Sequence, residues 1–258
     1  MFPQSLILTG KPCARHFRGL LLLPAAMTST KRPRFDQYEW VLFDADETLF
    51  HFDSFSGLKN LFSTYAVEFS ASDYQEYQAV NLPLWVEYQN GKISADTLKD
   101  RRFEAWGERL NVSPRELNRG FLLAMTDLCI PMDGVKELLM RLHGRARLGI
   151  ITNGFVDLQE IRLERTGLRS FFELLVISEQ VGFAKPDPEI FSYALTQMGR
   201  PDPSRVLMIG DNPHSDILGG TRAGLDTLWV NPKKIPRPEG IQPTFEFETL
   251  KNLTQDVN

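Results

Sequence analysis

The sequence is poor in cysteine, with only Cys13 and Cys129 among its 258 residues. Two cysteines are too few for a disulfide framework, and the CxxC and Cys/His spacings of zinc sites are absent. No run of about eighteen apolar residues occurs, so no segment is expected to span a membrane as a helix. These absences favour a cytoplasmic protein with no membrane partner.

Glycine and proline are present in ordinary amounts, 18 and 16 residues, which excludes collagen-like and low-complexity chains. The hydrophobic fraction of 42% is too high for a wholly disordered chain and is enough to bury a sizeable core. The length allows one large domain, or a main domain with a smaller companion.

Charge is unevenly distributed along the chain, whose net charge is −4. Residues 1–38 hold six Lys or Arg and one Asp, whereas residues 39–258 hold 23 Lys or Arg and 32 Asp or Glu. An acidic body is a poor non-specific partner for nucleic acid, so no nucleic-acid partner is expected.

Residues 1–38 differ in composition from the rest and are assigned to a leader. The run of four leucines before Pro24 imitates a signal peptide, but it is shorter than a usual signal core. The basic composition is also compatible with a transit peptide. Two interpretations remain. Either the leader is disordered, or translation starts at Met27 and residues 1–26 lie upstream of the true start.

Short apolar runs alternate with helix-length segments from residue 39 onward. This alternation predicts an α/β fold, a Rossmann-like, doubly wound parallel sheet with helices on both faces. Each run fits a strand that is buried on both faces. The expected strands are residues 40–43, 148–151, 174–177, 206–209 and 227–230.

About a hundred residues of helical character separate the first expected strand from the second. Ser113-Pro-Arg-Glu116 has the pattern of a helix N-cap, and Asp187-Pro-Glu189 marks another helix start. We assign residues 55–130 to an inserted helical cap domain. The catalytic core is then discontinuous, residues 39–54 plus 131–250, and residues 251–258 form a tail.

Polar side chains follow the expected strands, at the edge of the sheet where ligands bind in open parallel sheets. They are Asp44, Asp46 and Thr48 after the first strand, Thr152, Asn153 and Gly154 after the second, Lys185 beyond the third, and Asp211 and Asp216 after the fourth. Taken singly, each has a common structural explanation as a turn, a cap or a surface charge. Their occurrence together and in order favours one site.

These residue types suit an anionic phosphoryl group. Carboxylates placed close together repel one another, so a cation, a shared proton or a lysine must compensate. Mg²⁺ prefers a few protein carboxylates together with substrate phosphate, and Lys185 offers a positive charge for phosphate. Residues 152–154 precede an expected helix, whose N-terminus with a glycine is a natural phosphate cradle.

The order of these residues resembles the four motifs of the haloacid dehalogenase-like phosphohydrolases. The motifs are Asp44-x-Asp46-x-Thr48, Thr152-Asn153, Lys185-Pro186 and Gly210-Asp211-x4-Asp216. The resemblance covers nearly everything from residue 39 to about residue 250. Within this superfamily, residues 43–55 and 78–91 resemble bacterial pyrimidine 5'-nucleotidases.

The resemblance implies roles for the acidic residues. Asp44 is the nucleophile that forms an aspartyl-phosphate, and Asp46 is the general acid and base. Mg²⁺, with Mn²⁺ or Co²⁺ as alternatives, binds the Asp44 carboxylate, the Asp46 backbone carbonyl and Asp211. Asp216 supports the metal directly or through water.

The resemblance also implies how the phosphate is held. Lys185 relieves the repulsion between Asp44 and the incoming phosphate. Thr152 and the backbone N–H groups of Asn153 and Gly154 bind phosphoryl oxygens. Family dehalogenases lack an acid at the position of Asp46, so its presence favours a phosphatase.

The expected function is metal-dependent hydrolysis of pyrimidine nucleoside 5'-monophosphates (UMP, dUMP or dTMP) by a monomer or homodimer, with the nucleotide as its small-molecule partner. The alternatives are a phosphatase or phosphomutase for sugar phosphates or phosphoglycolate, and a binding or regulatory module without turnover. Base recognition is assigned to the cap and to residues 51–54. Candidate stacking residues, each more often core than ligand, are Tyr74, Tyr77, Trp85, Tyr88 and Trp106.

Overall fold

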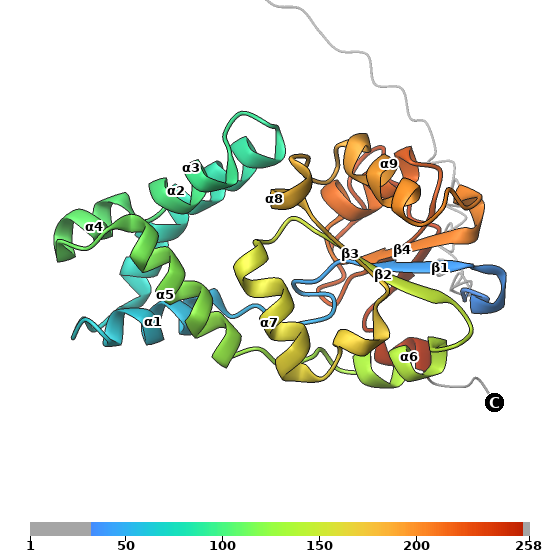
Figure 1. The fold of residues 1–258 in the computed structure, drawn as a ribbon, viewed down its shortest axis with the longest axis horizontal. Helices are drawn as coiled ribbons and strands as arrows, with labels where there is room; N and C mark the ends of the chain where they lie inside the picture. The colour runs from blue at the N-terminus through green and yellow to red at the C-terminus, as the bar shows by residue number, and fades with distance from the viewer. Residues whose placement is uncertain (1–31, 255–258) are drawn as a thin grey trace, which may run out of the picture. The chain divides into compact units, whose positions relative to one another are not determined.

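Strands β1 to β6 form a single parallel sheet in the order β3-β2-β1-β4-β5-β6 (Figure 1). The structure is a computed structural model, and it describes residues 32–254. The strands are β1 (Trp40–Phe43), β2 (Arg147–Thr152), β3 (Leu174–Ile177), β4 (Val206–Gly210), β5 (Asp226–Val230) and β6 (Phe245–Phe247). The predicted parallel α/β sheet is confirmed, with β6 added at one edge.

Helices cover both faces of this sheet, because alternate residues of the buried strands point to opposite sides. Val41 and Phe43 of β1 belong to a core cluster with helix α6, and Trp40 and Leu42 belong to a second cluster with helix α9. Figure 1 shows α6 and α9 on opposite sides of the strands. The helices of this part are α6 (Val135–Leu142), α7 (Val156–Thr166), α8 (Ser178–Val181), α9 (Pro188–Gln197), α10 (Leu218–Arg222) and α11 (Lys251–Thr254).

Short turns of other helical types complete the connections of the sheet. Three are 3₁₀ turns: η1 (Phe35–Gln37), η2 (Arg169–Phe171) and η3 (Pro203–Arg205). The fourth, η4 (Pro213–Ile217), is a π-helical turn that follows β4.

The chain between β1 and β2 contains a helical insertion, α1 to α5. Its helices are α1 (Ser54–Ser63), α2 (Ala71–Gln89), α3 (Ala95–Arg101), α4 (Glu104–Leu110) and α5 (Pro114–Asp127). Ser113 caps α5 by accepting a hydrogen bond from the Glu116 N–H, as its sequence predicts. The insertion has its own aromatic core, in which Phe62 packs 4.2 Å from Trp106 between ring centroids. This core also includes Phe155 and Leu158, next to and within α7, so the insertion packs against the sheet-bearing part of the chain.

Residues near both ends of the described range extend the predicted core. Residues 1–31 of the predicted leader and 255–258 of the predicted tail lie outside the described residues. Tyr38, assigned to the leader, is buried in the core, and its hydroxyl donates to Asp226 at 2.6 Å. Leu253 of α11, assigned to the tail, packs in the same cluster. Among residues 32–254, no helix combines the length and the apolar character needed to cross a membrane.

Candidate active site

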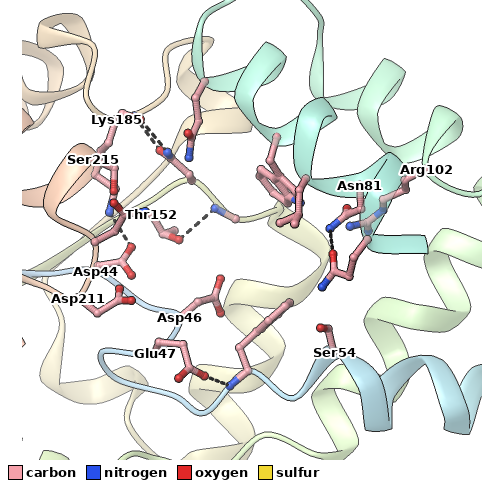
Figure 2. A pocket seen from close by; sticks show the side chains of 18 of the residues that line it. Asp44, Asp46, Glu47, Ser54, Asn81, Arg102, Thr152, Lys185, Asp211 and Ser215 are labelled. Atoms are coloured by element: carbon pink, nitrogen blue, oxygen red, sulfur yellow. Dashed lines mark hydrogen bonds and ion pairs between the residues drawn. The ribbon is translucent and has the colours of Figure 1, made fainter. Parts of the chain in front are cut away.

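Three neighbouring strands carry the predicted polar residues to one edge of the sheet. Asp44 follows β1, Thr152 ends β2 and Asp211 follows β4, and β1 pairs with both of the other strands. A cavity of about 330 Å³ opens at this edge (Figure 2). It is lined by seven of the predicted residues: Asp44, Asp46, Thr152, Asn153, Gly154, Lys185 and Asp211. The remaining two, Thr48 and Asp216, are buried and do not line it.

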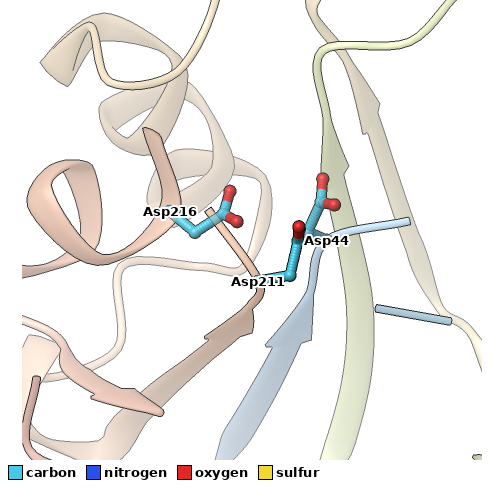
Figure 3. A group of neighbouring side chains, drawn as sticks. All are labelled: Asp44, Asp211 and Asp216. Atoms are coloured by element: carbon cyan, nitrogen blue, oxygen red, sulfur yellow. The ribbon is translucent and has the colours of Figure 1, made fainter. Parts of the chain in front are cut away.

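Asp44, Asp211 and Asp216 form a compact acidic cluster (Figure 3). One carboxylate oxygen from each lies within 4.8 Å of the others. Burial, and then the neighbouring charges of Asp216 and Asp46, raise the pKa of Asp44 to about 7, although Lys185 acts in the opposite direction. Burial, together with Asp216 and Asp44, raises the pKa of Asp211 to about 8. The cluster therefore favours a bound cation or bound protons.

Lys185 supplies part of the compensating charge from inside the protein. Its side chain is 1% exposed, and its Nζ lies 2.6 Å from Asp44 Oδ1 and 2.7 Å from Asp216 Oδ1. Nζ also donates to the Ile151 carbonyl at 2.7 Å. Burial alone would lower the pKa of Lys185, but Asp216 and Asp44 raise it above its ordinary value. Lys185 is thus held as a cation beside Asp44.

Asn153 fixes the backbone that carries this lysine. Its side-chain oxygen accepts from the Lys185 N–H at 2.7 Å, and its side-chain nitrogen donates to the Lys185 carbonyl at 2.9 Å. The predicted contribution of Asn153 is its own N–H, so the side-chain role is an addition. Nearby, the Gly154 N–H donates to Thr152 Oγ1 at 3.0 Å, which orients that hydroxyl at the end of β2.

The position of Asp216 depends on a glycine. A Cβ placed on Gly210 would lie 2.2 Å from Asp216 Oδ2 and would clash with it. Only glycine, which has no Cβ, leaves room for the Asp216 carboxylate at this position. Asp216 is fixed from its other side, because its Oδ2 accepts from the Asn212 N–H at 3.0 Å and its Oδ1 from Ser215 Oγ at 3.1 Å. The end of β4 is therefore shaped to receive a buried carboxylate.

This donor set fits a hard divalent cation. Asp44, Asp211 and Asp216 offer oxygen ligands only, and Mg²⁺ takes oxygen ligands. Cysteine and histidine, the ligands that a zinc or copper site would use, are absent from the cluster.

Asp46 lies apart from the acidic cluster and is held by an arginine that the sequence analysis did not identify. Arg162 of α7 is 1% exposed, and its Nη1 lies 2.5 Å from Asp46 Oδ1. Its Nη2 donates to Gln159 Oε1 at 2.6 Å, and its guanidinium lies over the Phe50 ring. Asp46 and Arg162 are 116 residues apart, and no motif links them in the sequence.

The other end of the cavity is built by the insertion. Of the five candidate stacking residues, Tyr77 and Trp85 line the cavity and the other three do not. Trp106 packs in the core of the insertion, the Tyr88 hydroxyl pairs with Ser178 at 2.8 Å, and that of Tyr74 pairs with Ser54 at 2.7 Å. Phe52 and Ser54 line the cavity from the expected 51–54 segment, whereas His51 and Asp53 do not.

Gln78, Asn81 and Arg102, here called the amide end, are among the cavity residues that no sequence motif indicated. Asn81 donates to Gln78 Oε1 at 2.9 Å. Figure 2 shows Asn81 and Arg102 across the cavity from Asp44 and Lys185. The spacing of Gln78 and Asn81 on one helical face is a signal that the sequence contains, whereas nothing local distinguishes Arg102 from the exposed Arg101 beside it.

Known proteins resemble this chain over most of its length. Pyrimidine 5'-nucleotidase YjjG of Escherichia coli is 57% identical over 85% of this chain and 97% of that protein. Pyrimidine 5'-nucleotidase PynA of Streptococcus pneumoniae is 32% identical over 84% of this chain and 93% of that protein. A crystal structure of the putative HAD-hydrolase YfnB of Bacillus subtilis, bound to magnesium, superposes with a TM-score of 0.74 at 31% identity, covering 84% of this chain and 96% of that one.

A family model confirms the resemblance inferred from the motifs. The model for haloacid dehalogenase-like hydrolases matches residues 38–224, which include every predicted site residue. Together with the parallel sheet and the carboxylates at its edge, this match shows that the chain belongs to the haloacid dehalogenase-like hydrolase family.

Proposed function

We propose that this protein is a metal-dependent phosphomonoesterase that hydrolyses pyrimidine nucleoside 5'-monophosphates, UMP, dUMP or dTMP, to the nucleoside and phosphate. The observation that carries the proposal is the two-ended cavity, which joins Asp44 and Lys185 to the aromatic and amide side chains of the insertion. The 57% identity to a protein named as a pyrimidine 5'-nucleotidase supports the choice of substrate.

In the proposed reaction Asp44 is the nucleophile. A carboxylate oxygen of Asp44 forms a bond to phosphorus while the bond from phosphorus to the 5'-oxygen breaks, and Asp46 gives a proton to that leaving oxygen. Asp46 then takes a proton from a water molecule, whose oxygen attacks the aspartyl-phosphate. The bond between Asp44 and phosphorus breaks, and phosphate leaves.

The remaining residues of this end hold the phosphoryl group. Lys185 offsets the repulsion between the Asp44 carboxylate and the phosphate. Thr152 and the Asn153 N–H stand at the end of β2, where they are proposed to donate to phosphoryl oxygens; the Gly154 N–H donates to Thr152 Oγ1 in this structure and would join them by exchanging that bond. Arg162 holds the Asp46 carboxylate at the edge of the cavity.

We further propose Mg²⁺ as the metal, held by the carboxylates of Asp44 and Asp211, with support from Asp216 and the backbone carbonyl of Asp46. When bound, the ion supplies charge neutralisation and orientation. Phosphate release measured after chelation and after addition of Mg²⁺, Mn²⁺ or Co²⁺ tests this assignment. Undiminished activity after chelation would contradict it.

The arrangement of the cavity also supports the predicted division of the chain into a cap and a catalytic core. We propose that residues 55–130 act as a cap over the catalytic core, residues 39–54 plus 131–250, because the insertion supplies one end of the cavity and the strand ends supply the other. The crystal structure of YfnB bound to magnesium reveals interdomain movement, which supports a mobile cap. Monomer or homodimer, and a cytoplasmic location, stay predictions from the sequence.

A substrate panel tests the proposed function. Phosphate release is measured with UMP, dUMP, dTMP, purine nucleotides, sugar phosphates and phosphoglycolate at equal concentration. We expect the pyrimidine nucleotides to have the highest kcat/KM. A preference for sugar phosphates or phosphoglycolate would favour the alternative phosphatase, and no turnover of a chromogenic aryl phosphate with Mg²⁺ would favour a binding module.

A further inference from the structure

The amide end of the cavity contains a buried positive charge that the proposed chemistry does not use. Arg102 follows α3, is 5% exposed, and lines the cavity together with Asn81 and Tyr77. Figure 2 places it across the cavity from Asp44, on the side of the insertion. In the proposed reaction the phosphoryl group is bound at the opposite end, so Arg102 would face a different part of a bound substrate.

This guanidinium has no carboxylate partner among residues 32–254. Its Nε donates to Asn118 Oδ1 at 3.0 Å, and its Nη2 donates to the same oxygen. The Tyr77 hydroxyl also accepts a hydrogen bond from it, and burial lowers the pKa of Arg102 from its ordinary value. A guanidinium has five N–H donors, and Asn118 and Tyr77 do not accept from all of them. Donors remain for a ligand in the cavity.

The surroundings of Arg102 suit a flat ligand group that both accepts and donates hydrogen bonds. Three phenylalanine rings surround the guanidinium carbon, with centroids 5.4 Å (Phe103), 5.2 Å (Phe121) and 5.2 Å (Phe155) away. Phe155 stacks on Trp85, which lines the cavity. In the same cavity, Asn81 and Gln78 present carboxamides, which both donate and accept. A carboxylate ligand would need donors only, whereas a pyrimidine base presents carbonyl acceptors together with ring or amino donors.

We propose that Arg102 donates a hydrogen bond to a carbonyl oxygen of the pyrimidine base and thereby determines the preference for nucleotides over base-free sugar phosphates. The inference rests on the proposed function, and it identifies the side chain that recognises the base of the nucleotide. Arg102 is a specificity-determining residue in this role, because it touches the substrate far from the reacting phosphorus.

The first test compares UMP with ribose 5-phosphate, which has the same phosphate and sugar but no base. Arg102→Met is expected to lower kcat/KM for UMP by about 10- to 100-fold, mainly through KM, because a hydrogen bond from a charged donor is lost. The kcat/KM for ribose 5-phosphate should stay within about threefold. Arg101→Met is the matched control, because Arg101 is exposed on α3 and pairs with Glu87 on the surface.

An equal loss for both substrates would show that Arg102 only supports the fold of the insertion, and it would overturn the inference. A selective loss for phosphoglycolate would also overturn it, because the guanidinium would then bind a carboxylate. If wild-type protein hydrolyses ribose 5-phosphate but no pyrimidine nucleotide, the proposed function itself has failed. The two failures are therefore distinguishable.

A second test uses the wild-type protein and does not depend on the folding of a variant. The 2-thio and 4-thio analogues of UMP each replace one carbonyl oxygen by sulfur, a poorer acceptor. We expect one analogue to have a kcat/KM about tenfold or more below that of UMP, which also identifies the oxygen that is bound. Hydrolysis of both analogues at the rate of UMP would show that neither carbonyl is read.

Discussion

At the scale of single residues, a substitution of Asp46 tests its proposed role as the general acid. Asp46→Asn keeps the shape of the side chain and a hydrogen-bond acceptor for Arg162, but it removes the proton that the leaving oxygen needs. We expect turnover of dTMP to fall by about 10²–10⁴-fold. Steady-state phosphate release measures it, with circular dichroism to confirm folding. Near-normal turnover would contradict the role of Asp46 as general acid.

Arg162 is expected to act through Asp46 as a positioning residue. Arg162→Met removes the contact at 2.5 Å and leaves the Asp46 carboxylate without its partner on α7. We expect kcat to fall by up to about 10²-fold with little change in KM, since misplacement of a catalytic group has effects of this order. Arg162→Lys should restore part of kcat. A change in thermal stability alone, with kcat unaltered, would assign Arg162 a purely structural role.

Gly210 gives a test of the metal site that removes no ligand. In Gly210→Ala the new methyl group would lie 2.2 Å from Asp216 Oδ2 and would displace that carboxylate. We expect the Mg²⁺ concentration for half-maximal activity to rise about 10- to 100-fold, as when the supports of metal ligands are altered. Ser215→Ala, which removes one hydrogen bond to Asp216 and adds no atom, should have a much smaller effect. Equal metal requirements in all three proteins would exclude Asp216 from the metal site.

The acidic residues and Lys185 were accessible to sequence reasoning because each follows a strand in a fixed order. Arg102 and Arg162 were not, because each stands in a helical region and no motif links it to its partner: Arg102 donates to Asn118, 16 residues away, and Arg162 to Asp46, 116 residues away. The sequence around a charged residue in a helix does not indicate whether its side chain is buried or exposed to solvent. Only the folded arrangement shows that Arg162 faces Asp46 and that Arg102 faces the cavity.

At the scale of elements, contacts between the insertion and the sheet-bearing part of the chain include a buried ion pair. Lys99 of α3 pairs with Glu179 of α8, and the side chains are 10% and 18% exposed. Because removing Lys99 leaves the partly buried Glu179 carboxylate with the Val156 N–H as its remaining hydrogen-bond partner, Lys99→Met is expected to lower the free energy of unfolding by about 1–3 kcal/mol. Urea denaturation measures it. In the double variant Lys99→Met, Glu179→Gln, part of the loss should be recovered.

The exposed pair of Arg101 and Glu87 is the control for this prediction. Arg101 belongs to the same helix, and its side chain is 51% exposed. Arg101→Met is therefore expected to change the free energy of unfolding by no more than about 1 kcal/mol. Equal effects of the substitutions at Lys99 and Arg101 would show that the buried pair does not hold the insertion in place.

Secondary structure was predictable where apolar runs were long enough to be buried on both faces. The five expected strands coincide with β1 to β5, within two residues at their ends. Strand β6 was missed because only Phe245 and Phe247 face the core and Glu246 interrupts them. Helix α2 continues through Pro83, a residue that usually ends a helix, so its length is not evident from the sequence alone.

At the scale of the whole molecule, the acidic cluster couples stability to pH and metal. Without a cation, the pKa of Asp44 is about 7 and that of Asp211 about 8, both above the ordinary value near 4. The folded protein then binds these protons more tightly than the unfolded chain. The contribution of both groups to stability therefore falls as pH rises from about 4 to about 8.

A bound divalent cation offsets this loss, because it replaces the protons. We expect the increase in Tm on addition of Mg²⁺ to be larger at about pH 8.5 than at about pH 6, where protons compete for the same oxygens. Differential scanning fluorimetry measures it. In Asp211→Asn the dependence on pH should be weaker. A Tm increase that is the same at both pH values would contradict the coupling.

The pairing of β1 with both β2 and β4 has a consequence for biosynthesis. Asp44 emerges from the ribosome early, but Trp40 pairs with Arg147 and with Val206, and those partners are made much later. Contacts of such long sequence separation form slowly, since a large loop must close first. The nascent chain therefore contains Asp44, the proposed nucleophile, long before it contains Lys185 and Asp211, and we expect a polypeptide truncated before β4 to show no phosphatase activity.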